Sequence, residues 1–292
     1  MNARQLDPGQ RSAVWVTEAA SGATRLLLET RDILLEAPNW SLDGDALYAN
    51  GDGRLWRIPL DGSPMTDVPL TGVPALNNDH VLDPDGMHIY LSAEDGNIYR
   101  APLAGGPAEL ITKACPVPGL VHFLHGVSAD GSRLAFIGLQ RDENGRARAA
   151  VFTVRTDGSD YRRLTDGTAP ADGSEYSPDG GWIYFNTEAF DGHAQIARMR
   201  TDGSGLEQLT DDEKVNWFPH LGATGAYACY LAYPPGTEGH PPDKWVDIML
   251  VEDGRWAHAR SIAHVHGGQG TINVHSWAPD GRRLAYVSHD RD

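Results

Sequence analysis

One turn motif recurs along the chain and constrains its fold more than any other feature. Its form is Ser/Asp/Ala-x-Asp-Gly, as in Ser177-Pro178-Asp179-Gly180, and a short apolar run follows each copy. Pro sets the backbone for the first corner of a turn, and Gly adopts the left-handed conformation that ends it. The copies, of which the fifth is degenerate, begin at Ser41, Asp83, Ser128, Ser177, Gly222 and Ala278.

Each copy opens a unit of similar composition. In the fourth unit the apolar run Trp182–Phe185 is followed by a second run, by a turn at Asp202-Gly203-Ser204, and by a third run that ends at Leu209-Thr210. Short apolar runs between Gly turns are typical of antiparallel strands. Four strands in a unit of roughly 40–45 residues form one blade of a β-propeller. We therefore predict an all-β fold, a six-bladed β-propeller with four antiparallel strands per blade.

The two ends of the chain complete each other. The sixth unit stops after its second strand, at Arg283–Val287. Residues 13–16 and 25–28 look like a third and a fourth strand that lack a first and a second. We expect the N-terminal strands to complete the last blade and close the ring, which would leave no open sheet edge. The alternative is an N-terminal hairpin unrelated to the sixth blade. A single domain, residues 1–292, is expected.

Composition narrows the function classes. The net charge of −16 argues against binding to nucleic acid or to anionic membranes. No 18-residue apolar run is present, so no membrane insertion is expected. The first residues lack an apolar signal core, and Cys115 and Cys229 fall in different units. Free thiols fit a reducing compartment, and we expect a cytoplasmic location.

The units resemble those of a known family. The sequence S-x-D-G, then Leu-Ala-Phe or Ile-Tyr-Phe, then Asp-Gly-Ser, then Leu-Thr, is similar to the repeat of TolB-like β-propellers, also called PD40 or WD40-like repeats. The segments Asn77–His80, Asn216–His220 and Gly268–Asn273 resemble a soluble, stand-alone bacterial subgroup of that family. The resemblance implies a propeller over nearly the whole chain.

Histidines recur at fixed distances before the turns. His80, His125 and His275 stand three residues before a turn, and His220 and Glu175 stand two residues before one. Equivalent positions of a propeller lie on a ring around its axis. We therefore expect these side chains to converge in the central channel.

Neutral imidazoles with a carboxylate or an amide are the ligands that Mn, Zn, Fe or Ni accept. We predict a divalent metal held by His80, His125, His220 and His275, with Gln269 or Glu175 as a further ligand. Asp79 and Asn78 could orient the rings. The alternative is a water-filled channel lined with polar side chains.

The remaining candidates concern a substrate. We predict Glu36, Glu175 and His125 as catalytic residues. The predicted substrate contacts are Asn78, Asn216, Trp217 and Asn273, with Trp217 stacking on a sugar ring. The chain is also similar to oligogalacturonate lyases, which implies a channel metal held by three histidines and a glutamine, and a metal-dependent lyase or isomerase acting on a sugar or sugar acid. The alternative is a non-catalytic scaffold that binds a protein or a small ligand. A G-x-S-x-G elbow, a P-loop and a Rossmann fingerprint are all missing from the sequence.

Overall fold

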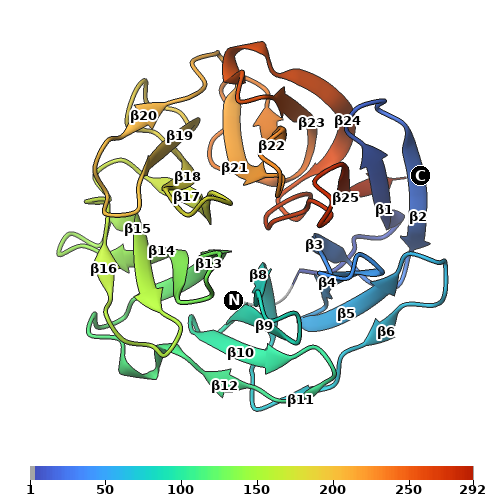
Figure 1. Cartoon of the computed structure of the whole chain (residues 1–292), viewed down its shortest axis with the longest axis horizontal. Helices are drawn as coiled ribbons and strands as arrows, with labels where there is room; N and C mark the ends of the chain where they lie inside the picture. Colours follow the sequence, from blue (N-terminus) through green and yellow to red (C-terminus); the bar gives the residue numbers. More distant parts are fainter. Residues whose placement is uncertain (1–3, 292) are drawn as a thin grey trace.

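The computed structural model describes residues 4–291, which form six blades around a central channel (Figure 1). The first three blades are β3(Leu35–Trp40)–β4(Ala46–Gly51)–β5(Arg54–Pro59)–β6(Thr66–Asp67), β8(Leu76–Leu82)–β9(His88–Ala93)–β10(Ile98–Pro102)–β12(Glu109–Leu110) and β13(Val121–Val127)–β14(Arg133–Arg141)–β15(Ala147–Arg155)–β16(Arg162–Arg163). The next two are β17(Ala171–Tyr176)–β18(Trp182–Thr187)–β19(Gln195–Arg200)–β20(Glu207–Gln208) and β21(Val215–Leu221)–β22(Tyr227–Tyr233)–β23(Pro242–Glu252)–β24(Arg260–Gly268). The sixth is β25(Arg283–Arg291)–β1(Gln10–Glu18)–β2(Thr24–Thr30). The all-β, six-bladed prediction is confirmed.

The recurring turn explains why the units look alike. In the fourth blade the hydroxyl of Ser177 donates to Asp179 Oδ1 at 2.5 Å and accepts a hydrogen bond from the Trp182 backbone nitrogen at 3.0 Å. Gly180 closes the turn at a φ of 70°. The same Ser–Asp pairing occurs in the first and third blades. The motif therefore fixes the connection between the innermost strand and the next strand of a blade.

Ring closure is made by the N-terminal strands, as predicted. β1 pairs with β25 over nine residues, from Gln10 opposite Arg291 to Glu18 opposite Arg283, and β2 pairs with β1 on the outside. The innermost segment of this blade, residues 271–277, is less regular and pairs with β25 through a bridge from Trp277 to Leu284. Strands from both ends of the chain thus form one blade.

The first and second blades are also linked by a separate two-stranded sheet. β7(Leu70–Thr71) and β11(Gly106–Pro107) form a short parallel pair between the first and second blades. Two 3-10 turns, η1(Thr112–Ala114) and η2(Trp256–His258), lie in connections. Within residues 4–291, no helix has the length and apolar character needed to cross a membrane.

The hydrophobic core lies between the blades. Large side chains such as Trp277, Tyr230 and Phe136 are almost fully buried there.

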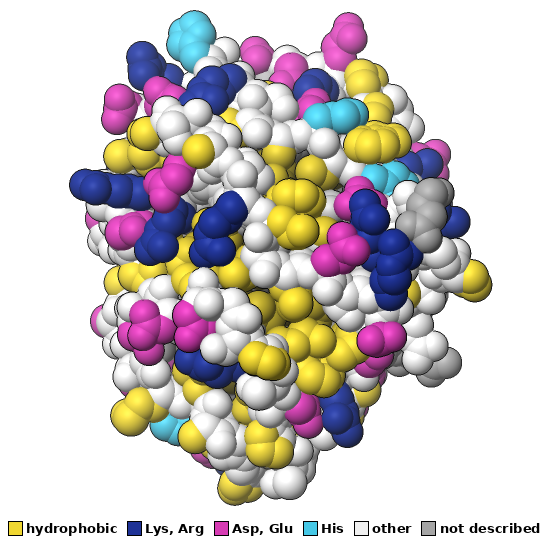
Figure 2. Space-filling model, turned by 90° about the vertical axis from the view of Figure 1, so that its right-hand side faces the viewer, with side chains coloured by type: hydrophobic (Ala, Val, Ile, Leu, Met, Phe, Trp, Pro, Cys, Tyr) yellow, Lys and Arg dark blue, Asp and Glu magenta, His cyan; other side chains and the backbone are white. Residues whose placement is uncertain are grey.

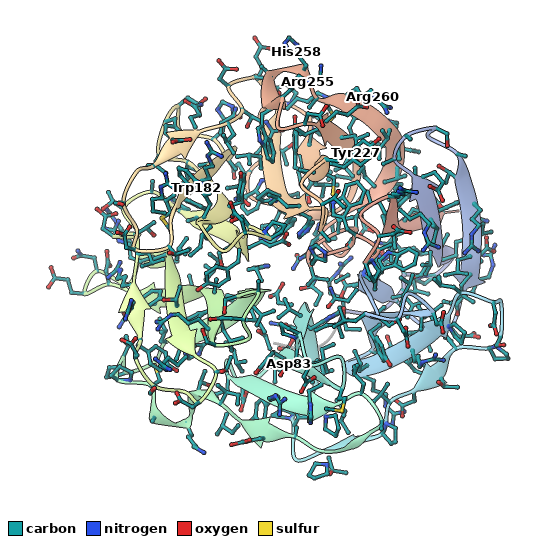
Figure 3. The ribbon with its side chains drawn as sticks, in the orientation of Figure 1. Asp83, Trp182, Tyr227, Arg255, His258 and Arg260 are labelled. Carbon is teal, nitrogen blue, oxygen red and sulfur yellow. The ribbon has the colours of Figure 1, made fainter. Side chains whose placement is uncertain are left out.

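Nearer the surface, arginines stack on an aromatic ring of the fourth blade. The guanidinium groups of Arg198 and Arg200 lie 4.1 and 3.7 Å from the centroid of the Trp182 ring, which is labelled in Figure 3. On the side of the ring shown in Figure 2, basic and acidic side chains are interspersed with apolar ones. That face therefore carries no large patch of one sign.

Candidate ligand-binding site

The channel contains two cavities, one at each end. The larger, of about 710 Å³, lies at the end where the innermost strands begin, and we call it the loop-side cavity. The smaller, of about 460 Å³, lies at the end of the recurring turns, and we call it the turn-side cavity. His125 lines both, so it lies between them.

One residue from every blade lines the loop-side cavity at the same position of the repeat, five residues before the turn. These six residues are Glu36, Asn78, Phe123, Asp172, Trp217 and Asn273. The sixfold repeat does assemble a ring of side chains around one cavity. These side chains stand two to three residues earlier in each unit than the histidines that were predicted to form the ring.

β-Bulges in the innermost strands determine which of the two cavities a side chain enters. In five blades the register of the innermost strand shifts, for example between Glu36 and Asn39 and between Asp172 and Glu175. A bulge interrupts the two-residue alternation of side chains and turns those that follow in a new direction. Ala37, Gly173 and Phe218 occupy the bulges of three blades with φ of 55°, 67° and 55°. Residues on either side of a bulge therefore reach different cavities.

The main polar cluster of the loop-side cavity centres on His125. Its Nε2 lies 2.8 Å from Asp172 Oδ1, its Nδ1 lies 4.0 Å from Asp79 Oδ1, and its Nδ1 also faces the Asn273 carbonyl at 3.2 Å. Burial alone would lower the pKa of His125, but the two carboxylates raise it to about 9. The imidazole is therefore a cation at neutral pH, with each ring nitrogen close to an oxygen.

The two carboxyl groups beside His125 differ in their own ionisation. Desolvation, aided by the nearby charges of Asp172 and Glu36, raises the pKa of Asp79 to about 6 despite the cation of His125. Asp172 is less buried, with its side chain 19% exposed. Although desolvation acts to raise its pKa, hydrogen bonding from His125 and His240 holds that pKa well below the usual range. His240 Nε2 lies 3.4 Å from Asp172 Oδ2. Asp172 is thus the ionised partner, and Asp79 titrates close to neutral pH.

Glu36 forms a second polar cluster in the same cavity. It pairs with the guanidinium of Arg4 and accepts hydrogen bonds at 3.4 Å from the amides of Asn50 and Asn78. Burial raises the pKa of Glu36 in spite of these contacts. Gly270, at a φ of +94°, packs so closely on Glu36 that a side chain there would collide with the carboxyl group. The Gly-rich loop therefore shapes this cavity.

An aromatic group forms part of the cavity wall. The Trp217 ring lies 4.4 Å from His240 and 5.7 Å from Phe218, measured between ring centroids. Trp217 is only 6% exposed, and its indole Nε1–H finds no acceptor in the described part of the chain. A buried donor without a partner is costly, so it points to an acceptor that is supplied by water or a ligand.

Glu175 organises a separate cluster at the turn-side cavity. Its Oε2 lies 2.7 Å from His220 Nδ1, its Oε1 lies 3.2 Å from His275 Nδ1, and its Oε1 also accepts the Leu221 backbone N–H at 2.9 Å. Despite burial, the two histidines and these hydrogen bonds lower the pKa of Glu175 to about 2. Glu175 therefore acts as a buried anion that holds three innermost segments together.

The four predicted metal-ligand histidines do not share one site. His125 lies between the cavities, His275 lines the turn-side cavity, and His220 uses both ring nitrogens, on Glu175 and on the Ile272 carbonyl. His80 is buried, with Nδ1 on Asn39 Oδ1 at 3.0 Å and with a pKa lowered by burial to about 3. Among residues 4–291, no group of three or more His, Cys, Asp or Glu side chains is arranged to hold a metal ion. The reason is that carboxylates and carbonyls already take the nitrogens of His125 and His220.

The other predicted residues divide in a similar way. Glu36, Asn78, Trp217, Asn273 and Gln269 all line the loop-side cavity. Asn216 lines neither cavity, because its amide nitrogen is directed to Gln195, Thr210 and Asp212. Cys115 and Cys229 are free thiols, and Cys229 is buried.

Sequence reasoning missed three members of the site. Asp172 occupies the same repeat position as Glu36, Asn78 and Asn273, so comparing that position across all units would have found it. His240 lies in the loop between β22 and β23, and the length of this loop is the signal that could have found it. Nothing in the sequence placed Arg4 in the lining of this cavity, where its guanidinium pairs with Glu36.

Comparison with known proteins gives the family. The chain is 36% identical to an uncharacterized protein of Agrobacterium fabrum over 285 residues, covering 96% of this chain and 92% of the relative. A solved structure from Agrobacterium tumefaciens, assigned as a TolB, is 34% identical with a TM-score of 0.88 and covers 97% of this chain and 99% of that one. The chain belongs to the TolB-like β-propellers.

More distant structures share the fold of this TolB-like propeller. TolB from Acinetobacter baumannii is 16% identical with a TM-score of 0.58, and the match covers 96% of this chain and 64% of that one. An oligogalacturonate lyase in complex with manganese is 14% identical with a TM-score of 0.56, covering 85% and 71%. At these identities the likeness concerns the fold. No family model matches the sequence.

Proposed function

We propose that this TolB-like propeller binds a small polar molecule of carbohydrate size in the loop-side cavity and can transfer protons on it. The observation that carries the proposal is the ring of one residue from each blade around a cavity of about 710 Å³, with buried ionisable groups at its base. Concave sites with a few converging polar groups and shifted pKa values are the usual location of ligand binding.

The chemistry that these residues offer is acid–base. Asp79, with a pKa of about 6, is a carboxylate at neutral pH that can accept a proton. His125, with a pKa of about 9, is an imidazolium that can donate one, and Asp172 holds its ring in place. Two adjacent groups with pKa values on either side of neutrality suit the removal of a C–H proton and the protonation of an oxygen. Isomerisation or elimination on a hydroxylated substrate is the reaction class that fits.

A divalent metal is not part of this proposal. A ligand imidazole must offer a lone pair, whereas both nitrogens of His125 and both nitrogens of His220 face oxygen acceptors. The Glu175 cluster also opens on the other cavity. The donor set therefore does not fit the predicted metal centre, and a non-catalytic ligand-binding role is the second candidate.

The test is ligand binding followed by turnover. Thermal unfolding should be measured with neutral, cationic and anionic sugars, because a ligand present at 100 times its Kd stabilises the folded state by about 2.7 kcal/mol. His125→Gln should abolish turnover of a bound ligand, and Trp217→Leu should weaken its binding.

The matched control is His264→Gln, on the outer strand β24, where the side chain is 62% exposed. Binding and turnover should be unchanged in this variant. If no member of the panel binds, or if His125→Gln turns over as fast as the unmodified protein, the corresponding part of the proposal is lost.

A further inference from the structure

The loop-side cavity is strongly acidic. Seven of its lining residues carry carboxyl groups: Glu36, Asp52, Asp79, Glu94, Asp172, Glu188 and Glu238. Arg4 is the one arginine in the lining, and His125 and His240 are the histidines. Such a cavity attracts cations and repels the carboxylates of sugar acids.

A guanidinium group already occupies this cavity. Arg4 donates through Nη1 to the Glu36 carboxyl group and, at 3.1 Å, to the Gln269 carbonyl. It comes from the segment ahead of β1, and its side chain remains 26% exposed. Glu36 is buried, and Arg4 is the cation that acts to lower its pKa. The chain thus shows which charge this subsite prefers.

The segment that carries Arg4 is anchored behind it. Asp7 Oδ2 accepts a hydrogen bond from Arg291 Nη2 at 2.6 Å, and Gln10 Nε2 donates to Asp243 Oδ1 at 2.6 Å. The anchors lie on the ring, whereas Arg4 lies three residues before Asp7. Arg4 can therefore leave the cavity without breaking the β1–β25 pairing.

The rest of the cavity would suit the body of an organic cation. Trp217, Phe218 and Phe123 present aromatic rings in the lining, and such rings attract cations through their faces. The unpaired Nε1–H of Trp217 requires a hydrogen-bond acceptor. A ligand with one cationic group and a nearby hydroxyl or carbonyl oxygen would satisfy both features.

We infer that the loop-side cavity selects an ammonium or guanidinium compound that also carries a hydroxyl or carbonyl oxygen, and that Arg4 is a displaceable internal occupant of its cation subsite. The inference rests on the proposed function and names its ligand class. Amino sugars and amino alcohols belong to this class. Arg4 lowers the apparent affinity for such a ligand, because a tethered group competes at an effective concentration in the millimolar range.

The test compares Arg4→Ala with the unmodified protein by isothermal calorimetry. The probes are glucosamine and methylguanidinium as cations, glucose as the neutral analogue and galacturonate as the anion. Arg4→Ala should bind the cations more tightly, by about tenfold. Adding Glu36→Gln to Arg4→Ala should remove most of that gain. Arg146→Ala, in the exposed turn between β14 and β15, is the control and should bind like the unmodified protein.

Each outcome decides between the two proposals. If glucose binds but neither cation does, or if Arg4→Ala gains no affinity for the cations, the inference is overturned and the proposed function stands. Loss of galacturonate binding in Arg4→Ala would also overturn it, because Arg4 would then be an anion ligand. If none of the probes binds to any variant, the inference and the proposed function both fail.

Discussion

At the residue scale, the ionisation of the channel depends on how each histidine is partnered. His80 is buried beside a neutral amide and its pKa falls to about 3, whereas His125 is equally buried between two carboxyl groups and its pKa rises to about 9. Desolvation acts in the same direction on both rings. Only the neighbouring charges differ, so the partner decides which histidine is a cation.

This difference predicts how stability changes with pH. The pKa of His125 is about 9 in the folded protein and about 6.5 when unfolded. Its contribution is therefore complete below pH 6.5 and is lost as the pH rises to about 9. Removing one partner of a buried ion pair typically costs about 3–5 kcal/mol. Urea unfolding of His125→Gln should show its largest deficit at pH 6 and a smaller one at pH 9.

The exposed variant His264→Gln serves as the reference for that measurement and should show a small effect at both pH values. A deficit of His125→Gln that grows from pH 6 to pH 9 would mean that the imidazole is buried in its neutral form.

The sequence predicted which residue types would meet in the channel but not how they would pair. Glu36, Asn78, Trp217 and Asn273 do line one cavity. The metal hypothesis assumed free imidazole nitrogens, and those of His125 and His220 are taken by Asp172, Glu175 and backbone carbonyls. Such pairing depends on distances of a few ångströms across blades, which residue spacing alone does not report.

At the scale of the element, the innermost strands are the least regular part of the ring, and their bulges set the depth at which each side chain enters the channel. Gly173 stands at the bulge of β17 with a φ of 67°, where an added Cβ would lie 3.1 Å from both Asn186 Oδ1 and the Phe218 Cα. The predicted convergence of the histidines requires regular innermost strands. The bulges instead separate side chains that regular strands would bring together.

Two glycine variants test the role of this bulge. Gly173 and Gly180 have nearly the same positive φ, but Gly180 has no atom within 4 Å of an added Cβ. Gly180→Ala should therefore cost only the backbone strain, on the order of 1 kcal/mol. Gly173→Ala should cost more, because the neighbouring strand β21 must also move. Chemical unfolding of both variants measures the difference, and equal costs would show that the bulge tolerates a side chain.

At the scale of the whole molecule, closure joins the two ends of the chain into one blade. The fold was predictable because its signals are local and repeated: the turns, the short apolar runs and the incomplete units at the two ends. The placement of Arg4 was not predictable from the sequence. It depends on the path of the segment that precedes β1, and this path is set only once the ring has formed.

Two truncations separate closure from occupation of the cavity. Removing residues 1–30 deletes β1 and β2 and leaves β25 with an unpaired edge, so this variant should aggregate or unfold. Removing residues 1–5 deletes Arg4 but keeps β1, so this variant should remain monodisperse and keep its strand content. Size-exclusion chromatography and circular dichroism measure both, and a well-folded 1–30 deletion would refute closure by the N-terminal strands.

The position of Arg4 has a practical consequence for work with this protein. A purification tag placed ahead of Arg4 is joined next to a residue that lines the loop-side cavity, whereas Arg291, at the end of β25, does not line that cavity. A histidine tag ahead of Arg4 would bring extra imidazoles close to this cavity, where they can bind a metal ion or act as a cationic ligand. Screening is therefore best done with the tag at the C-terminus, or after an N-terminal tag has been cleaved.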